Sequence, residues 1–110
     1  MAGELYSPIL DECSSMAALA DGYDCILHGD SQVVITGGTD DLTTDMFVKS
    51  CEAVGILTQK DVMHPMTTGS TGMINSLGAG AILLEEMDQA IKRKVKIYAE
   101  VKGYAMSCEG

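Results

Sequence analysis

The 110-residue sequence predicts an α/β fold, because helix-like and strand-like hydrophobic patterns alternate along it. Three observations support this prediction. An apolar stripe with three- and four-residue spacing covers residues 14–28, a short apolar run covers residues 32–36, and strict alternation covers residues 95–102. No linker, internal repeat or low-complexity segment divides the sequence. We therefore expect one domain over residues 1–110.

Residues 14–28 form the first predicted helix. Ser14 or Ser15 is suited to cap its start, and Gly29 follows its end. Gly22, in the middle of this helix, costs up to about 1 kcal/mol relative to alanine. We therefore expect close packing against the helix at this glycine.

The first predicted strand covers residues 32–36 and is followed by Gly37 and Gly38. A continuous apolar run bounded by glycines is typical of a strand buried on both faces, as in a parallel sheet. A second helix is predicted over residues 43–54, with Gly55 as its stop.

The second half of the chain continues the alternation. Residues 56–80 are predicted to be mostly loop, because Pro65 and several glycines interrupt them. A strand is predicted over residues 81–84 and a helix over residues 85–94, whose acids come first and whose bases come last, as the helix dipole favours. Residues 95–102 alternate between apolar and polar side chains, which predicts a last strand with one wetter face.

Composition and charge exclude several classes of partner. The net charge is −9, from 16 acidic and 7 basic residues, whereas a nucleic-acid binder needs a basic surface. Four of the bases cluster at Lys92, Arg93, Lys94 and Lys96, and three of them fit the end of a predicted helix. No apolar run approaches the roughly 18 residues of a membrane span, and the first ten residues do not resemble a signal peptide. We therefore expect a cytoplasmic protein without nucleic-acid or membrane partners.

The sequence also predicts no metal and no cofactor. The four cysteines form no CxxC pair, which argues against a structural zinc site and favours reduced thiols. The glycine-rich residues 69–80 contain neither a P-loop nor a dinucleotide-binding GxGxxG motif between a strand and a helix. We interpret their glycines as points of close backbone approach in a packed core.

Cys13 is the candidate catalytic residue, because it stands directly before the first predicted helix. The dipole and the free N–H groups at a helix start favour the thiolate, which is the nucleophilic form of cysteine. The neighbouring acids Asp11 and Glu12 oppose the thiolate, and a free cysteine is also commonly an inert core residue. His28 and His64 show no arrangement around Cys13 in the sequence.

Three segments occur together in an order and spacing that match one enzyme family. They are Cys13-Ser14-Ser15 with Gly29-Asp30 and residues 33–38, then residues 72–85, then residues 86–94 with residues 97–104. These segments resemble the β-ketoacyl synthases, which are thiolase-fold enzymes that condense acyl thioesters. The segments correspond to the nucleophile elbow with its helix and strand, the glycine-rich turn into a core strand, and the helix and strand that follow. Residues 37–41 and 65–68 are most similar to the ketosynthase domain of fungal-type fatty acid synthases.

The resemblance covers about residues 13–107 and implies a partial thiolase-like fold, a mixed sheet with helices packed on it. It implies that Cys13 accepts an acyl group, which then condenses with a malonyl thioester in fatty acid or polyketide synthesis. The implied partners are acyl-carrier-protein thioesters and the remainder of a synthase domain or multienzyme, which is expected to be oligomeric. The family's two catalytic histidines belong to motifs that these residues do not contain. We therefore expect an incomplete synthase segment.

Two alternatives stay open. The first is a catalytically inactive, ketosynthase-like structural or interaction segment. It is favoured by acids beside Cys13 and by an interval from Cys13 to Gly29 that is one residue shorter than in the family. The second, a small-molecule binding module, rests only on the glycine-rich residues 69–80.

Overall fold

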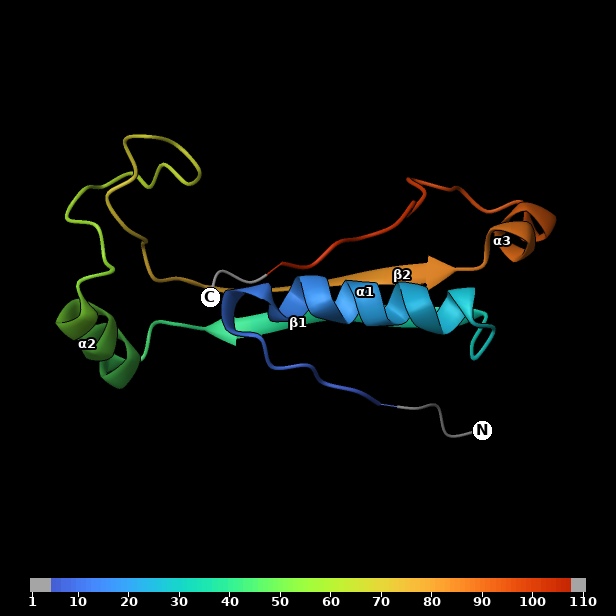
Figure 1. Cartoon of the computed structure of the whole chain (residues 1–110), viewed down its shortest axis with the longest axis horizontal. Coiled ribbons are helices and arrows are strands. Elements are labelled where there is room, and N and C mark those ends of the chain that lie inside the picture. Colours follow the sequence, from blue (N-terminus) through green and yellow to red (C-terminus); the bar gives the residue numbers. More distant parts are fainter. Residues whose placement is uncertain (1–4, 108–110) are drawn as a thin grey trace. The chain divides into compact units, whose positions relative to one another are not determined.

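The computed structural model describes residues 5–107 of the chain (Figure 1). In chain order, the helices and strands are η1 (Asp11–Cys13, a short 3-10 helix), α1 (Ser14–Leu27), β1 (Val33–Asp41), α2 (Asp45–Val54), β2 (Leu77–Glu85) and α3 (Met87–Arg93). Contacts divide the described residues into two compact units, one of residues 5–38 and 80–107 and one of residues 39–79. The expectation of one domain stays a prediction.

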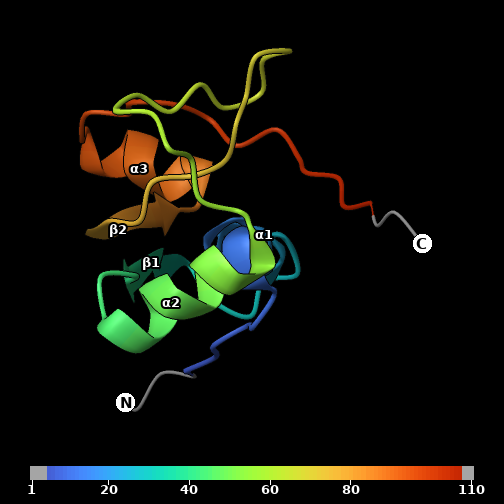
Figure 2. The same cartoon turned by 90° about the vertical axis from the view of Figure 1, so that its left-hand side faces the viewer.

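In the first unit, helix α1 lies along the paired strands β1 and β2, as both views show (Figures 1 and 2). This arrangement confirms the α/β class with helices packed on a sheet. The parallel direction inferred for residues 32–36 is wrong, because β1 pairs with β2 in antiparallel orientation. Ile35 is 75% exposed, whereas Thr36 on the opposite face is buried. An apolar run shows that both faces of a strand carry hydrophobic side chains. It does not determine whether the neighbouring strand is parallel or antiparallel.

Helix α1 packs closely on the sheet at Gly22. Gly22 is buried together with Ala17 and Ala20. A Cβ atom at Gly22 would lie only 3.2 Å from Leu84 Cδ1 and from Val34 Cγ1. The expected close packing at this glycine is thus confirmed, and it sets the distance between α1 and the strands.

The start of α1 differs from the prediction. Its N-cap is Cys13, which makes no side-chain cap hydrogen bond. Ser14 and Ser15, the expected caps, are the first two residues inside the helix. The reason is that the Ser14 hydroxyl bonds backwards to the preceding turn instead of forwards to the helix. The end of α1 is close to the prediction, with Gly29 at φ +80° just beyond it.

Helices α2 and α3 lie within the ranges expected for them. Helix α2 ends at Gly55, which adopts a left-handed conformation at φ +77° and thereby stops the helix. Glu86 caps the start of α3, because its carboxylate accepts hydrogen bonds from the N–H groups of Asp88 at 3.0 Å and Gln89 at 2.9 Å.

Two strand predictions need correction. Strand β2 begins at Leu77, four residues before the predicted strand over residues 81–84, so Gly78 and Gly80 pair in the sheet and are not loop residues. Residues 95–102 form no strand in the part of the chain that the structure describes. A strand requires a hydrogen-bonded neighbour as well as alternation, and neither β1 nor β2 pairs with this segment.

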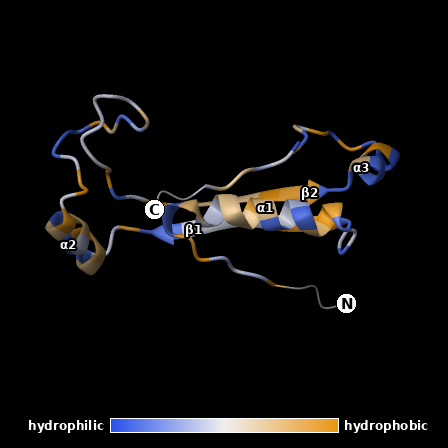
Figure 3. Ribbon diagram, viewed as in Figure 1, coloured by the Kyte–Doolittle hydropathy of each residue, from blue (hydrophilic) through white to orange (hydrophobic). Residues whose placement is uncertain are grey.

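The described residues leave much apolar surface exposed. Strand β2 is strongly hydrophobic (Figure 3), yet Ile82 and Leu83 are more than half exposed. The buried apolar residues within the described part of the chain are small: Ala17, Ala20, Cys51 and Ala90. The sheet therefore has hydrophobic surface that these residues do not cover.

The second unit contains α2 and a loop that is held by one isolated parallel bridge between Leu57 and Met73. The N–H of Thr58 donates to the carbonyl of Met73, and the N–H of Met73 donates to the carbonyl of Ile56, both at 2.9 Å. Gly72 lies beside the bridge at φ +125°, and a Cβ atom there would lie 2.5 Å from the Ile56 carbonyl oxygen. The interpretation of close backbone approach is thus confirmed at Gly72.

Residues 95–107 return to helix α1 through Tyr104. The Tyr104 hydroxyl donates a hydrogen bond to Asp24 Oδ2, and its ring meets the Tyr23 ring edge to face at 6.2 Å between centroids. This hydrogen bond raises the pKa of Tyr104 above its usual 10.0, since the bond requires the phenol proton and the Asp24 carboxylate repels a phenolate.

We predict that Tyr104→Phe destabilises the first unit at neutral pH and has no effect at high pH. The raised pKa means that the contact stabilises the fold below about pH 10 and that this contribution is lost as pH rises through the folded-state pKa. Urea unfolding followed by circular dichroism at both pH values measures the difference. The control is Tyr98→Phe, because Tyr98 is 86% exposed. An equal effect of Tyr104→Phe at both pH values would contradict the prediction.

We predict that Gly37→Ala destabilises the protein by about 1–3 kcal/mol, as overpacking does in well-packed regions. A Cβ atom at Gly37 would lie 2.1 Å from the Gly80 carbonyl oxygen and 2.8 Å from Ala81 Cα, and both atoms belong to the backbone. Gly80→Ala is the matched control, because a Cβ atom at Gly80 meets nothing within 4 Å. Chemical denaturation of both variants tests the prediction, which fails if their midpoints agree.

Candidate active site

Cys13 lies at the junction of η1 and α1, with its thiol exposed. It is the last residue of η1 and the N-cap of α1, at φ −91° and ψ −1°. The N–H of Ser14, the first residue of α1, donates to the carbonyl of Asp11. The next N–H groups in the first turn of a helix have no partner within the helix, so they can act as donors beside Cys13. The structure therefore places the predicted nucleophile at an accessible helix start.

The turn before Cys13 is closed by the Ser14 side chain. The Ser14 hydroxyl accepts a hydrogen bond from the N–H of Leu10 at 2.9 Å and donates to the carbonyl of Asp11 at 2.7 Å. The N–H of Cys13 donates to the carbonyl of Leu10 at 3.0 Å. These three bonds connect the residues on both sides of Cys13, so they fix its backbone.

Asp11 gives this turn its sharp bend. Its backbone lies in the left-handed region at φ +48°, which costs energy for most residues other than glycine. Aspartate is one of the few residue types that tolerate this conformation. The acid that sequence analysis treated only as an unfavourable charge beside Cys13 thus also has a backbone role.

The glycine pair of β1 allows α1 to begin close to the sheet. A Cβ atom at Gly38 would lie 1.9 Å from the Ser15 hydroxyl oxygen. A larger residue at this position would force the Ser15 hydroxyl to rotate away, and its Cβ atom would still lie 3.0 Å from Ser15 Cβ in the first turn of α1. Gly38 therefore leaves room for the first turn of α1 beside the candidate nucleophile, whereas Gly37 allows close approach to the backbone of β2.

Neither histidine is shown to serve Cys13. His28 is the C-cap of α1, and the 14 residues of that helix separate it from Cys13 by about 20 Å. That distance excludes a hydrogen bond between the His28 ring and the Cys13 thiol. His64 lies in the second unit, where its carbonyl accepts a hydrogen bond from the Thr67 hydroxyl at 3.1 Å.

The other cysteines are less accessible than Cys13. Cys25 is half-buried in α1, and Cys51 is 4% exposed in α2. Cys108 lies outside the described residues. Within residues 5–107, no group of three or more His, Cys, Asp or Glu side chains could hold a metal ion.

Comparison with known proteins identifies the family. The model for "Beta-ketoacyl synthase, N-terminal domain" matches residues 11–90, which begin two residues before Cys13 and include α1, β1, α2 and β2. The chain belongs to the β-ketoacyl synthase family. The resemblance found in the sequence is thereby confirmed, whereas the expectation of an incomplete synthase segment stays a prediction.

Several curated relatives match most of this β-ketoacyl synthase chain. The 3-oxoacyl-(acyl-carrier-protein) synthase 2 of Synechocystis sp. is 30% identical over 97 residues, which are 84% of this chain and 23% of the relative. The enzyme of the same name from Coxiella burnetii is 32% identical over 74% of this chain and 21% of its own length. Probable polyketide synthase 10 of Dictyostelium discoideum is 29% identical over 88% of this chain, but only 4% of that protein is covered. The chain thus spans less than a quarter of each relative.

None of the helices in the described part of this synthase segment is both long and apolar enough to cross a membrane.

Sequence reasoning proposed Cys13 as the site residue, and that role stays a prediction. It missed the turn closed by Ser14. The pattern that could have revealed it is a serine directly after the cysteine, three residues beyond an aspartate that tolerates a left-handed backbone. Serine at that place suggests a helix cap equally well, so the sequence alone does not separate the two roles.

We predict that Cys13 is alkylated faster than Cys25 and Cys51 at neutral pH, because only the thiol of Cys13 is exposed among these three. Brief iodoacetamide treatment of folded protein, followed by peptide mapping, ranks the thiols. Alkylation in urea is the control, because unfolding should bring the three rates together. Equal labelling in the folded protein would contradict the prediction.

Proposed function

We propose that this chain supplies the acyl-accepting cysteine of a β-ketoacyl synthase. The observation that supports this proposal is the exposed Cys13 thiol at the start of α1, inside the segment that matches the family. The Cys13 thiolate attacks the carbonyl carbon of an acyl thioester and forms a tetrahedral intermediate. The carbon–sulfur bond to the donor then breaks, the acyl group stays on Cys13 Sγ, and the donor leaves as a thiol with the proton that Cys13 lost.

The acyl donors are proposed to be acyl-carrier-protein thioesters. Two relatives are named 3-oxoacyl-(acyl-carrier-protein) synthase 2, which supports this class of donor. The wider proposal is a condensation with a malonyl thioester in fatty acid or polyketide synthesis, since a third relative is named a polyketide synthase. A cytoplasmic location and an oligomeric full enzyme also stay proposals.

The condensation step requires groups beyond Cys13. Loss of CO₂ from a malonyl thioester leaves negative charge on the thioester oxygen, and hydrogen-bond donors must stabilise that charge. The family resemblance assigns this role to two histidines in motifs that the sequence does not contain. The relatives are more than four times as long as the matched segment, so we propose that the remainder of the synthase supplies those donors.

A second candidate function is an inactive structural segment. The acids Asp11 and Glu12 directly before Cys13 favour it, because they oppose the approach of an anionic donor and the formation of the thiolate. The two candidates differ in whether Cys13 accepts an acyl group.

We predict that an activated acyl thioester acylates Cys13 of the folded chain. Mass spectrometry should detect one added acyl group, which peptide mapping places on Cys13. Cys13→Ala should abolish the adduct, whereas Cys25→Ala, the matched control on the same helix, should keep it. An adduct distributed over several cysteines, or none at all, would contradict the proposal and favour the structural alternative.

The same chain should not release labelled CO₂ from a malonyl thioester above background. Each missing donor to the developing charge typically costs about 10²–10³ in rate, so the loss of two leaves no measurable turnover. Release that depends on Cys13, with Cys13→Ala as the control, would show that this chain has its own donors. The proposal that the remainder of the synthase supplies them would then be wrong.

A further inference from the structure

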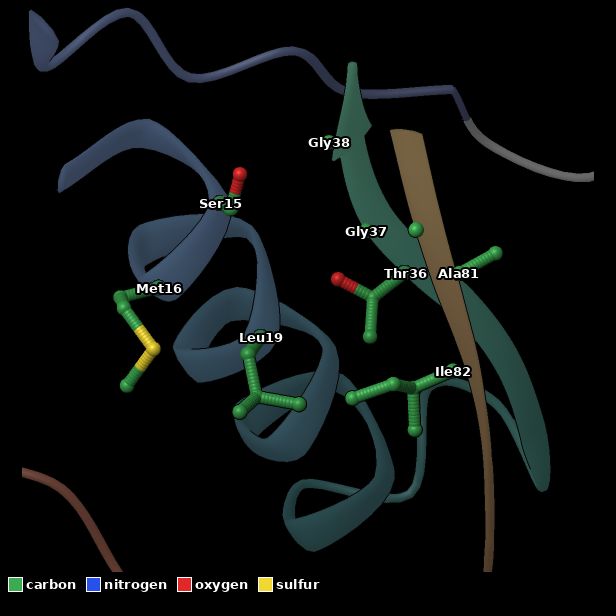
Figure 4. A pocket seen from close by; sticks show the side chains of 9 residues that line it. Ser15, Met16, Leu19, Thr36, Gly37, Gly38, Ala81 and Ile82 are labelled. Carbon is green, nitrogen blue, oxygen red and sulfur yellow. The ribbon is translucent and has the colours of Figure 1, made fainter. Parts of the chain in front are cut away.

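An apolar groove lies within the first unit, between the first turns of α1 and the sheet (Figure 4). Its volume is about 310 Å³, at the lower end of the range for small-molecule sites. Its walls are formed by Ser15, Met16 and Leu19 of α1, by Thr36, Gly37 and Gly38 of β1, and by Gly80, Ala81 and Ile82 of β2.

The missing side chain at Gly80 helps to open this groove. Alternate residues of a strand share a face, so Thr36 and Gly38 share one with each other, as do Gly80 and Ile82. At Gly80, an added Cβ atom would meet nothing within 4 Å. At Gly22, further along α1, the added atom would lie 3.2 Å from two side chains. Helix and sheet are therefore tightly packed at Gly22 and, through Ser15, at Gly38, and they leave a space beside Met16, Leu19 and Gly80.

One buried polar group in the groove lacks a partner. Thr36 is 7% exposed, and its hydroxyl forms no hydrogen bond within the described part of the chain. Figure 4 shows this hydroxyl directed from β1 towards α1, between Ser15 and Leu19. A buried hydroxyl without a partner is unfavourable, because folding removed it from water without compensation.

The walls define what could occupy the groove. None of the nine lining residues is charged, so an ionic ligand would lose its hydration without gaining a counterion. Met16, Leu19 and Ile82 offer flexible aliphatic contacts, and the Thr36 hydroxyl can donate or accept one hydrogen bond. A single water molecule would satisfy Thr36, but it would leave the apolar walls without contacts.

We infer that this groove binds a neutral aliphatic molecule with one hydrogen-bonding group, of the class represented by medium-chain primary alcohols. The aliphatic chain lies along Met16, Leu19 and Ile82, and the polar group bonds to the Thr36 hydroxyl. Cys13 does not line the groove, so this binding goes beyond the proposed acylation and does not depend on it.

Titration of the folded chain with 1-octanol, followed by ligand-observed nuclear magnetic resonance, tests the inference. Saturable binding is expected. Thr36→Val keeps the branched shape and removes the hydroxyl, so it should weaken binding roughly five- to tenfold, as the loss of one hydrogen bond does. Thr39→Val is the matched control on the same strand, because Thr39 is exposed. Cys13→Ala should also bind as the unchanged chain does, which separates this test from that of the proposed function.

Gly80→Ala provides a second test if Thr36→Val does not fold. Its methyl group occupies open space in the groove wall, so it should weaken 1-octanol binding while circular dichroism stays unchanged. Two results would overturn the inference. One is the absence of saturable binding to the unchanged chain. The other is binding that neither Thr36→Val nor Gly80→Ala weakens.

Discussion

The close approach of helix α1 to the β1–β2 sheet is the contact on which the first unit depends. Gly22 permits it on the helix, because an added Cβ atom would lie 3.2 Å from side chains of both strands. Gly38 permits it on the sheet, beneath the Ser15 hydroxyl. A helix so close to the sheet begins at a fixed place, and Cys13 is the residue at that place. The absence of side chains at these two positions thus permits the helix that begins after Cys13 to lie close to the sheet.

The small residues between helix and sheet also leave space that no side chain fills. Gly22 allows close contact with Leu84 and Val34, whereas Gly80 of β2 leaves open space in the groove that contains the Thr36 hydroxyl, which has no hydrogen-bond partner there. Apolar residues such as Ile35 and Leu83 also remain exposed on the sheet. Dispersion contacts are lost wherever such surfaces face no atoms, so the described residues gain less from burial than the 46% hydrophobic composition of the full chain would allow.

The candidate site has a hydrogen-bonded turn beside Cys13, but no imidazole is shown beside its thiol. Hydrogen bonds from Leu10 to Ser14 and from Ser14 to Asp11 fix the backbone beside Cys13. No imidazole is shown to accompany this thiol, since His28 caps the far end of α1. Acceptance of an acyl group needs chiefly the thiolate, whereas condensation needs donors to a developing negative charge. This difference is the reason for the proposal that the two steps depend on different parts of a synthase.

The sequence by itself determined the α/β class, the three main helices, the packing role of Gly22 and the family to which the chain belongs. Local properties decide these features: hydrophobic spacing, helix stops such as Gly55, and motifs in a fixed order. Only the tertiary structure decided that β1 and β2 are antiparallel, that β2 begins at Leu77 and that residues 95–102 are not in a strand. It also decided that Ser14 bonds backwards and that Thr36 has no partner. Strand pairing and the hydrogen bonding of buried polar groups depend on which residues, far apart in the sequence, come together in the fold. Local sequence patterns do not specify these contacts.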